Sequence, residues 1–356
     1  MSLFNNMLRS DQTLFKDPVA LDYDYLPKLL PFRENEQFAL ANCIKPLFSN
    51  RNARNAIVYG SPGIGKTAAC KHVLRDLENQ TDEIEQVFVN CWQKNSTFKV
   101  LVEACHQLGY RLTHNKRTDD LMNELKRILN KSTSVLVFDE IDKSEDYDFL
   151  YMFLEEIYKK SIILITNDND WIASLDERIR SRLTPELIEF KAYNLNETKS
   201  IIKQRVDYAL FENVISDKLI NQIAEKTFEK KDIRSGLFLV KESANCAEDA
   251  SRKEINEEDV NKAISKLLDF KKKGETDLAE DEIVILNLIK ESSGKRIGDL
   301  FKDYQQKNPN AIYKTFQRKI KKLNDNGYIS SKSIAGGKEG RTTIIEYDSN
   351  KKLTEF

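Results

Sequence analysis

The sequence predicts an α/β domain with a parallel sheet, then an all-helical segment, then a small domain of three helices and a hairpin. Three observations lead to this prediction. Short apolar runs alternate with amphipathic helical patterns up to about residue 190, as in sheets whose parallel strands are buried on both faces. From residue 194 to 270 the pattern is helical throughout. After residue 276, three helical patterns precede two strand-like segments.

The composition limits the classes of function. Of the 356 residues, 40% are hydrophobic and 32% are charged, which favours charged globular domains over disorder. The formal net charge is -1, so any positive field suited to nucleic acid must be local. Residues 1–16 lack the apolar segment of a signal peptide, and no apolar run is long enough to span a membrane. These features predict a cytoplasmic protein without a membrane partner.

The cysteines and histidines show no metal-ligand or disulfide pattern. No pair of cysteines has C-x-x-C spacing, so we expect buried free thiols in a reducing cytosol. Cys105 and His106 are adjacent, but neighbours on a helix point in different directions, which excludes a catalytic pair.

A glycine-rich turn between a strand and a helix is the most specific motif in the chain. Residues 60–67 match the pattern G-x-x-x-x-G-K-[ST] in full, and residues 55–59 before them read as a short apolar strand. The glycines let backbone N–H groups converge on phosphate oxygens, and the N-terminus of the following helix attracts the same anion. Lys66 would reach the β- and γ-phosphates, and the Thr67 hydroxyl would ligate Mg²⁺. We expect a nucleoside triphosphate to be bound by Ser61, Pro62, Gly63, Ile64, Gly65, Lys66, Thr67 and Ala68.

The segment before this turn is rich in aromatic residues and turn formers. Residues 15–31 include Tyr23, Tyr25 and three prolines, and a helical pattern follows them. Such a segment is well placed to cover an adenine ring with apolar side chains. Packing against neighbouring helices would explain the same residues equally well.

Strand and helix patterns continue to alternate after the turn. Residues 86–91 read as a strand, and residues 96–108 and 120–129 read as helices. A polar, basic loop at residues 114–118 separates the two helices.

Two carboxylates end the strand at residues 134–140. Four consecutive apolar residues indicate that this strand is buried on both faces of the sheet. Asp139 and Glu140 stand at its carboxyl end, where open α/β sheets bind their ligands. We expect Asp139 to hold Mg²⁺, directly or through water, and Glu140 to orient and polarise the attacking water.

The next strand, at residues 161–168, ends in polar residues. The Asn167 amide could hydrogen-bond the γ-phosphate or the water, although asparagine is also common in turns at strand ends. Further on, Arg178, Arg180 and Arg182 could be a solvated helix end or could offer a guanidinium to the nucleotide of a neighbouring subunit. Residues 187–190 read as the last strand of the sheet.

Four helical patterns follow the sheet, the last three at residues 215–228, 234–250 and 257–270. Arg234, near the start of one of them, could project back to the nucleotide or remain solvated. Gly236 predicts an irregular start for this helix, since a better helix former is expected there. Residues 271–276, three lysines followed by a glycine, read as a linker.

The C-terminal pattern is that of a winged helix-turn-helix. Helices at residues 280–291, 296–306 and 311–325 precede a hairpin at residues 328–347. Ile312, Phe316, Ile320 and Leu323 are predicted to form the core face of the third helix. From residue 295 to 356 the chain has fourteen lysines and arginines against seven acids. We expect DNA contacts from Lys314, Arg318 and Lys321 on the helix and from Lys332, Lys338 and Arg341 on the wing.

Together these motifs resemble those of the AAA+ initiators that recognise replication origins in archaea, relatives of the eukaryotic origin-recognition and helicase-loading proteins. The resemblance covers nearly the whole chain, with residues 60–67 matching Walker A and residues 137–142 matching Walker B. It implies an ATPase base domain at residues 1–192, a helical lid at 193–272 and a winged-helix domain at 277–356.

The resemblance also implies roles for single residues. Asn167 would act as sensor 1 and Arg234 as sensor 2, and Arg182 is the first choice for an arginine finger. Lys116 and Arg117 lie where the family carries an inserted segment that makes a second DNA contact. The residues implied for the adenine pocket are Tyr25, Leu26, Pro27 and Arg33.

The implied function is that of an ATP-dependent replication initiator. It would bind origin duplex DNA, assemble with further initiator subunits and help to recruit or load the replicative helicase, with ATP or ADP and Mg²⁺ as cofactors. Hydrolysis would be slow, because the arginine supplied in trans comes only from a partner. Two alternatives stay open: a DNA-bound regulator or plasmid-maintenance protein that uses the ATPase as a switch, and a remodeller whose winged helix binds protein.

Overall fold

The structure is a computed structural model that describes residues 13–168, 171–276, 280–308, 311–325, 328–334 and 342–347. The chain forms two compact units, Met1–Val260 and Asn261–Phe356. The first contains the predicted α/β domain and most of the all-helical segment. The second contains the three C-terminal helices and the hairpin.

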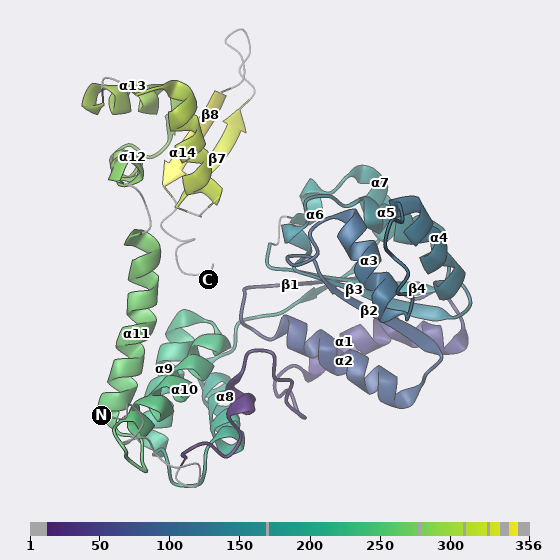
Figure 1. The fold of residues 1–356 in the computed structure, drawn as a ribbon, viewed down its shortest axis with the longest axis horizontal. Coiled ribbons are helices and arrows are strands. Elements are labelled where there is room, and N and C mark those ends of the chain that lie inside the picture. Colours follow the sequence, from purple (N-terminus) through teal and green to yellow (C-terminus); the bar gives the residue numbers. More distant parts are fainter. Residues whose placement is uncertain are drawn as a thin grey trace. The chain divides into compact units, whose positions relative to one another are not determined.

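A parallel five-stranded sheet forms the centre of the first unit (Figure 1). The strand order is β2-β3-β4-β1-β5, and every neighbouring pair is parallel. All residues of β3 and β4 are buried, as the sequence predicts for central strands that are covered on both faces. The strands are β1 (Ala56–Tyr59), β2 (Ile84–Asn90), β3 (Thr133–Asp139), β4 (Lys160–Thr166) and β5 (Glu186–Glu189).

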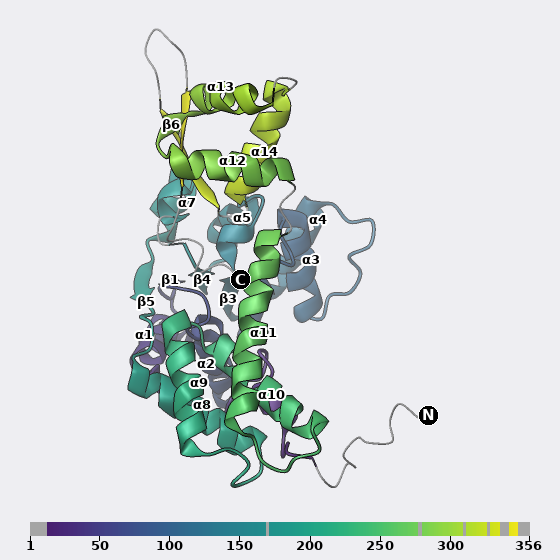
Figure 2. The same cartoon turned by 90° about the vertical axis from the view of Figure 1, so that its left-hand side faces the viewer.

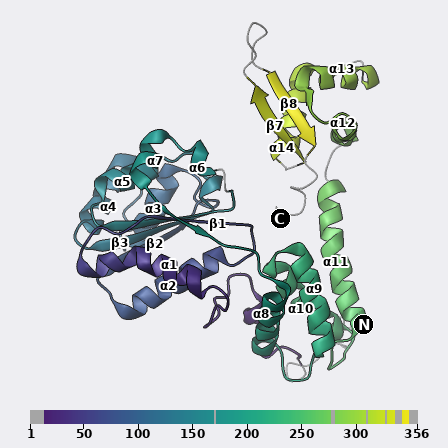
Figure 3. The same cartoon turned by 180° about the vertical axis from the view of Figure 1, so that it is seen from behind.

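Helices cover both faces of this sheet (Figures 1 and 3). Successive residues of β3 point to opposite faces, so Val137 joins the core beneath α1 and α2, whereas Phe138 joins the core beneath α3, α4 and α5. The Phe138 ring lies 5.0 Å from the ring of Phe149 on α5. The helices on the two faces are α1 (Glu34–Ile44), α2 (Lys66–Gln80), α3 (Thr97–Gln107), α4 (Thr118–Leu129), α5 (Asp148–Glu156), α6 (Trp171–Ser174) and α7 (Glu177–Leu183).

Three helices that follow β5 pack against one another in the same unit (Figure 2). They are α8 (Leu195–Ala209), α9 (Asp217–Lys230) and α10 (Ile233–Asp249). The N-terminal segment joins them, because Phe15 forms an antiparallel bridge with Leu210. The short 3-10 helix η2 (Pro18–Leu21) then packs on α8 and α10.

The prediction of an irregular start for α10 is wrong. The helix runs without interruption from Ile233 to Asp249. A Cβ at Gly236 would lie 2.4 Å from Thr227 Oγ1 and 2.5 Å from Ile202 Cδ1, so glycine lets α10 pack closely on its neighbours. The requirement for glycine comes from tertiary packing rather than from the helix itself.

The prediction of a linker at residues 271–276 is also wrong. These residues are the last turns of a continuous helix, α11 (Glu257–Thr276). Lysine and glutamate are good helix formers, and a single glycine costs only about 1 kcal/mol in a helix interior. Asn256 and Asp259 cap the start of this helix: Asn256 Oδ1 accepts from the Asp259 backbone N–H at 3.0 Å, and the Asp259 carboxylate accepts from the Asn256 backbone N–H at 3.0 Å.

The second unit has the element order predicted for a winged helix-turn-helix (Figure 3). A two-residue strand that the sequence did not reveal, β6, pairs with β8, and the small antiparallel sheet has the order β6-β8-β7. Its elements are α12 (Glu280–Glu291), β6 (Lys295–Arg296), α13 (Ile297–Lys307), α14 (Tyr313–Asp325), β7 (Ile329–Ile334) and β8 (Thr342–Tyr347).

The core face of α14 is three residues long rather than four. Phe316, Ile320 and Leu323 are buried, but Ile312 is 67% exposed. The prediction fails for Ile312 because the helix begins two residues later than predicted, at Tyr313.

Among the described residues, none of the helices combines the length and the apolar composition that a membrane span needs.

Candidate nucleotide-binding site

A cavity of about 300 Å³ opens at the carboxyl ends of the sheet strands in the first unit. The N-terminal segment, the glycine-rich turn, β3, β4, α8 and α10 all contribute to its lining. Most of the side chains that the sequence predicts for nucleotide binding and hydrolysis therefore meet in one place. The predicted residues that line it are Tyr25, Pro27, Pro62, Gly63, Gly65, Lys66, Thr67, Ala68, Asp139, Glu140, Asn167 and Arg234.

Four residues predicted for the cofactor do not line this cavity. They are Leu26, Arg33, Ser61 and Ile64. Ile64 is buried in the core on the α1 and α2 side of the sheet. The Ser61 carbonyl oxygen accepts a hydrogen bond from Lys66, so Ser61 acts within the turn.

Arg33 supports the glycine-rich turn instead of facing the cavity. Its guanidinium is buried and donates to the carbonyl oxygens of Ile64, at 3.1 Å, and Lys191, at 2.7 Å. It also donates to the Tyr193 hydroxyl at 2.9 Å, lies 3.9 Å from the centre of that ring and pairs with Glu36. Arg33 thus links the N-terminal segment, the turn and the connection between β5 and α8.

The glycines of the turn allow close approach of other backbone segments. Gly60 has φ of +145°, and a Cβ there would lie 2.3 Å from the Phe190 carbonyl oxygen. Gly63 has φ of +72°, and a Cβ there would lie 1.9 Å from Asp232 Oδ1. The helical segment consequently rests directly on the turn, where the Ile233 backbone N–H also donates to the Gly63 carbonyl oxygen at 3.1 Å.

Lys66 is held at the base of the cavity by three acceptors. Its Nζ donates to the carbonyl oxygens of Gly60, at 2.7 Å, and Ser61, at 2.8 Å, and to Asn167 Oδ1 at 2.7 Å. Burial lowers the pKa of Lys66 to about 8, although the carboxylates of Glu140 and Asp139 oppose this change. The lysine is therefore fixed where a phosphate group would meet it.

Thr67 and Asp139 form the oxygen pair predicted for a metal ion. The Thr67 hydroxyl donates to the Asp139 carboxylate, with distances of 3.0 and 3.2 Å to the two oxygens. Burial raises the pKa of Asp139 to about 6, and the neighbouring Glu140 charge adds to this effect. A hydroxyl and a carboxylate side by side fit Mg²⁺, which prefers oxygen ligands and uses few from protein.

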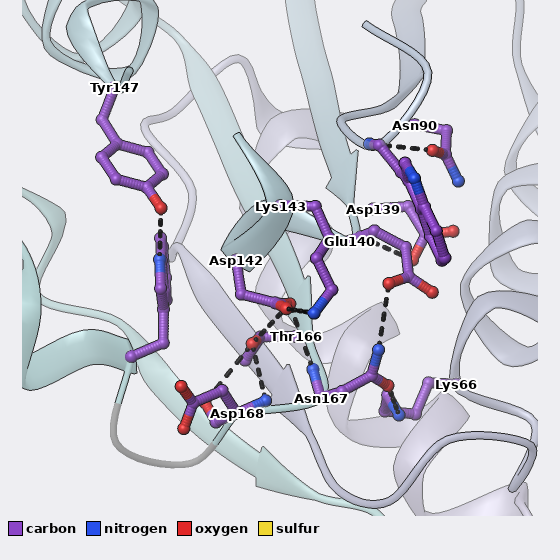
Figure 4. A network of polar contacts seen from close by, with 12 residues as sticks. Lys66, Asn90, Asp139, Glu140, Asp142, Lys143, Tyr147, Thr166, Asn167 and Asp168 are labelled. Carbon is purple, nitrogen blue, oxygen red and sulfur yellow. Dashed lines mark hydrogen bonds and ion pairs between the residues drawn. The ribbon is translucent and has the colours of Figure 1, made fainter. Parts of the chain in front are cut away.

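Glu140, Asn167 and Lys66 point toward one another from three different elements (Figure 4). Asn167 Nδ2 donates to Glu140 Oε2 at 3.0 Å, while its Oδ1 accepts from Lys66. Glu140 has φ of +54°, a left-handed conformation that turns the chain sharply at the end of β3. The amide of Asn167 thereby connects the predicted water-orienting carboxylate with the predicted phosphate-binding lysine.

Two family descriptions match the part of the chain that builds this site. Residues 49–167 match an AAA domain, and residues 199–265 match a Cdc6 AAA+ ATPase-type lid domain. ORC1-type DNA replication protein 2 of Methanosarcina mazei is 30% identical over 359 residues, which cover 96% of this chain and 95% of that protein. The chain belongs to the family of ORC1-type DNA replication proteins.

Other similarities agree with this assignment. ORC1-type DNA replication protein 1 of Sulfurisphaera tokodaii is 32% identical over 267 residues, which cover 71% of this chain and 67% of that protein. The structure of the Aeropyrum pernix ORC1 protein in complex with DNA has a TM-score of 0.71 at 22% identity, covering 96% of this chain and 95% of that one. These findings confirm the predicted AAA+ fold with a helical lid, and membership of the family supports ATPase activity.

Arg234, the predicted sensor 2 of the lid, lines the cavity beside an acidic partner. Its guanidinium donates to both carboxylate oxygens of Asp232, each at 3.2 Å. Asp232 also caps α10 by accepting from the Arg234 backbone N–H at 2.9 Å. Asp232 therefore fixes both the start of the lid helix and the direction of Arg234.

The three arginines of α7 lie away from the cavity lining. Arg182, the first choice for an arginine finger, pairs with Glu155 and lies 5.3 Å from the centre of the Tyr151 ring. Arg178 pairs with Asp176, and Arg180 is exposed. This position is consistent with a role toward a second subunit and contributes nothing to the cavity of the same chain.

Four of the eight predicted DNA-contacting residues are exposed in the described part of the structure. Lys314, Arg318 and Lys321 are exposed on α14, opposite its core face. Arg117 is exposed and Lys116 half-buried in the loop between α3 and α4. Lys332 belongs to β7, its side chain lying outside the described part of the structure, and Lys338 and Arg341 lie outside the described residues.

Two residues at or beside the cavity, Arg205 and Asp142, were not predicted as site residues. Arg205 of α8 lines the cavity and donates to the carbonyl oxygens of Ala20 and Tyr25, which fixes the N-terminal segment against the lid. Asp142 accepts from Thr166 and Asn167. Its sequence signal is its position as the last acid of the Walker B motif. No local pattern distinguishes Arg205 from other arginines on helices.

Proposed function

We propose that this chain is an ATP-dependent replication initiator that binds origin duplex DNA and helps to recruit or load the replicative helicase. The observation that carries the proposal is the meeting of Lys66, Asp139, Glu140, Asn167 and Arg234 in one cavity between base and lid. A cavity with these residues suits ATP hydrolysis, and its location between two parts of the unit suits a switch.

The residues of the chain would divide the work of hydrolysis. The glycine-rich turn and Lys66 would bind the phosphate groups, and Thr67 with Asp139 would hold Mg²⁺, which neutralises phosphate charge when bound. Glu140 would orient the attacking water, and Asn167 would hold Glu140 in place through the 3.0 Å hydrogen bond. Tyr25 and Pro27 would contact the adenine ring, as the lining of the cavity by both residues supports.

Hydrolysis would be slow in the isolated chain. Arg234 is supplied by the lid, but the arginines of α7 do not line the cavity of their own subunit. A further initiator subunit would have to present Arg182, or one of its two neighbours, to complete the charge stabilisation. ATP would accordingly act as a switch for assembly on DNA.

The second unit would supply most of the DNA contacts. We propose that α14 enters the major groove with Lys314, Arg318 and Lys321, while the wing residues Lys332, Lys338 and Arg341 contact phosphates. Lys116 and Arg117 would add a contact from the base. In functional terms the chain would comprise an ATPase base at residues 1–192, a lid at 193–272 and a winged-helix domain at 277–356, acting on the nucleoid in the archaeal cytoplasm.

A footprint on chromosomal DNA tests the proposal. We expect the purified protein to protect repeated sequences near a replication start, with weaker protection as salt increases. A pulldown from the same cells should recover the replicative helicase. Protection confined to promoters, together with recovery of transcription machinery, would show a regulator instead.

A further inference from the structure

A carboxylate beside the cavity connects the ends of two strands. Asp142 lies in the 3-10 turn η4 (Ile141–Lys143) that follows β3, and its side chain is 7% exposed. Its Oδ1 accepts from Thr166 Oγ1 at 3.0 Å and from the Asn167 backbone N–H at 3.3 Å. Asp142 itself does not line the cavity, so any effect on the nucleotide must pass through other residues.

The contact lies just beyond the point where the sheet stops joining these strands. The register of β3 and β4 ends with the pair Phe138 and Leu164. Past that pair, the turn after β3 and the end of β4 meet through Asp142 (Figure 4). The Thr166 hydroxyl oxygen also accepts from the Asp168 backbone N–H at 3.0 Å, which fixes both sides of Asn167.

The side chain of Asn167 donates one hydrogen bond and accepts another. The Asn167 side chain donates to Glu140 Oε2 at 3.0 Å and accepts from Lys66 Nζ at 2.7 Å. Lys66 also donates to two carbonyl oxygens of the turn. For the Glu140 carboxylate, the Asn167 amide is the one side-chain donor seen among the described residues. A shift of the Asn167 backbone would therefore disturb Glu140 more than Lys66.

We propose that Asp142 is a positioning residue for ATP hydrolysis, because it sets the backbone of Asn167 and through it the orientation of Glu140. This positioning depends on the acceptor oxygen of Asp142 and does not depend on its negative charge. The inference rests on the proposed ATPase function of the cavity. It makes Asp142 a determinant of turnover that leaves nucleotide binding nearly intact.

The test compares three substitutions in the full-length protein. Asp142→Ala removes both accepted hydrogen bonds, and we expect kcat to fall about 10- to 100-fold, as for small misplacements of reacting groups. The Kd for ADP should stay within about 3-fold of wild type, because Lys66 keeps its contacts in the turn. Asp142→Asn keeps an acceptor oxygen without the charge and should restore most of kcat. Lys143→Met removes the ion pair at 3.2 Å and should leave kcat unchanged.

Asp146→Ala is the matched control. This carboxylate is four residues further on and accepts from the Thr97 backbone N–H, at 3.1 Å, away from Asn167. We expect Asp146→Ala to lower thermal stability but not kcat at a temperature where the protein is folded. Equal losses of kcat in Asp142→Ala and Asp142→Asn would overturn the proposal, as would a parallel loss of ADP affinity.

A crystal structure of Asp142→Ala with ADP gives a readout that requires neither turnover nor DNA. We expect the Asn167 amide to move away from Glu140. If the contact between Asn167 and Glu140 stays at its wild-type length of 3.0 Å, Asp142 does not position it. Failure of the origin footprint would refute the initiator function and leave this inference standing, because the two experiments share no readout.

Discussion

The cavity of the first unit and the exposed face of α14 both gather charged side chains, but they hold them in opposite ways. At the cavity, Lys66 is 6% exposed and Asp139 is 3% exposed, and each has hydrogen-bonding partners. On α14, Lys314 and Arg318 are exposed. A buried charge is costly unless it is paired, whereas an exposed one stays hydrated. The first arrangement suits a ligand of fixed geometry, and the second suits a long polyanion read through many weak contacts.

Loss of the lysine at the base of the cavity should have the largest effect. Lys66→Ala removes the charge that would meet the β- and γ-phosphates, and we expect ATP and ADP affinity to fall more than about 100-fold. Isothermal titration with each nucleotide measures this. Lys126→Ala, on α4 and paired with Glu156, is the control and should bind nucleotide normally. Retained affinity in Lys66→Ala would place the nucleotide elsewhere.

Glu140→Gln should separate binding from turnover. Glutamine fills the same space but cannot polarise water, so we expect hydrolysis to fall about 100- to 1000-fold while ATP still binds. Steady-state ATPase assays and titration of ATP give the two values. Hydrolysis at the wild-type rate would show that another group orients the water.

Arg33→Ala tests how far burial fixes charged groups around the turn. The substitution leaves the carbonyl oxygens of Ile64 and Lys191 without this donor and removes the stacking on Tyr193. We expect the free energy of unfolding to fall by about 3 kcal/mol, measured by denaturant titration. Arg178→Ala, an exposed arginine, should change it by less than about 0.5 kcal/mol. Similar values for the two variants would contradict the comparison between buried and exposed charges.

Arg318→Ala tests the exposed face directly. We expect duplex affinity to fall by about 1–3 kcal/mol if Arg318 contacts bases, with a smaller loss on unrelated sequences. A phosphate contact would instead weaken all duplexes alike and reduce the salt dependence of binding. Lys319→Ala is the neighbouring control, since Lys319 pairs with Asp281 at 2.6 Å and its side chain is 17% exposed. An equal loss in both variants would show a general charge effect.

Gly236→Ala should have the smallest effect, and its sign is informative. A Cβ would lie 2.4 Å from Thr227 Oγ1, so overpacking should cost about 1–3 kcal/mol and outweigh the gain of about 1 kcal/mol in helix propensity. Gly298→Ala, on α13, is the control, because a Cβ there meets nothing within 4 Å. We expect thermal unfolding to show destabilisation for Gly236→Ala and none for Gly298→Ala. A stabilised Gly236→Ala variant would mean that α10 has room to move.

Much of the fold was predictable because its signals are local. The five strands, the helices α1 to α4, and the order of the three helices and the hairpin in the second unit follow the predicted pattern, whereas α5 and β6 were not predicted. The exceptions are instructive. Residues 271–276 look like a linker only if the strength of their helix formers is ignored, and Ile312 looks like a core residue only if the helix starts early.

The candidate site was predictable where a motif fixes the backbone. Lys66, Thr67, Asp139 and Glu140 face one cavity, because a glycine-rich turn and the carboxyl end of a buried strand dictate where these side chains lie. The place of Arg33 was not predictable, since an arginine before a helix carries no sign that its guanidinium will stack on Tyr193, 160 residues away.

The sequence by itself determined that the chain has a phosphate-binding turn, a strand with an acidic end, an all-helical segment and a basic C-terminal helix. Those features depend on residue types at short spacing. Only the tertiary structure decided that Asp142 accepts from Asn167, that Asp232 pairs with Arg234 and lies against Gly63, and that Gly236 must lack a side chain. Each of these depends on a contact between residues that are not neighbours in the sequence. The strength of such a contact is set by burial and by distance, and the sequence alone shows neither the burial nor the distance.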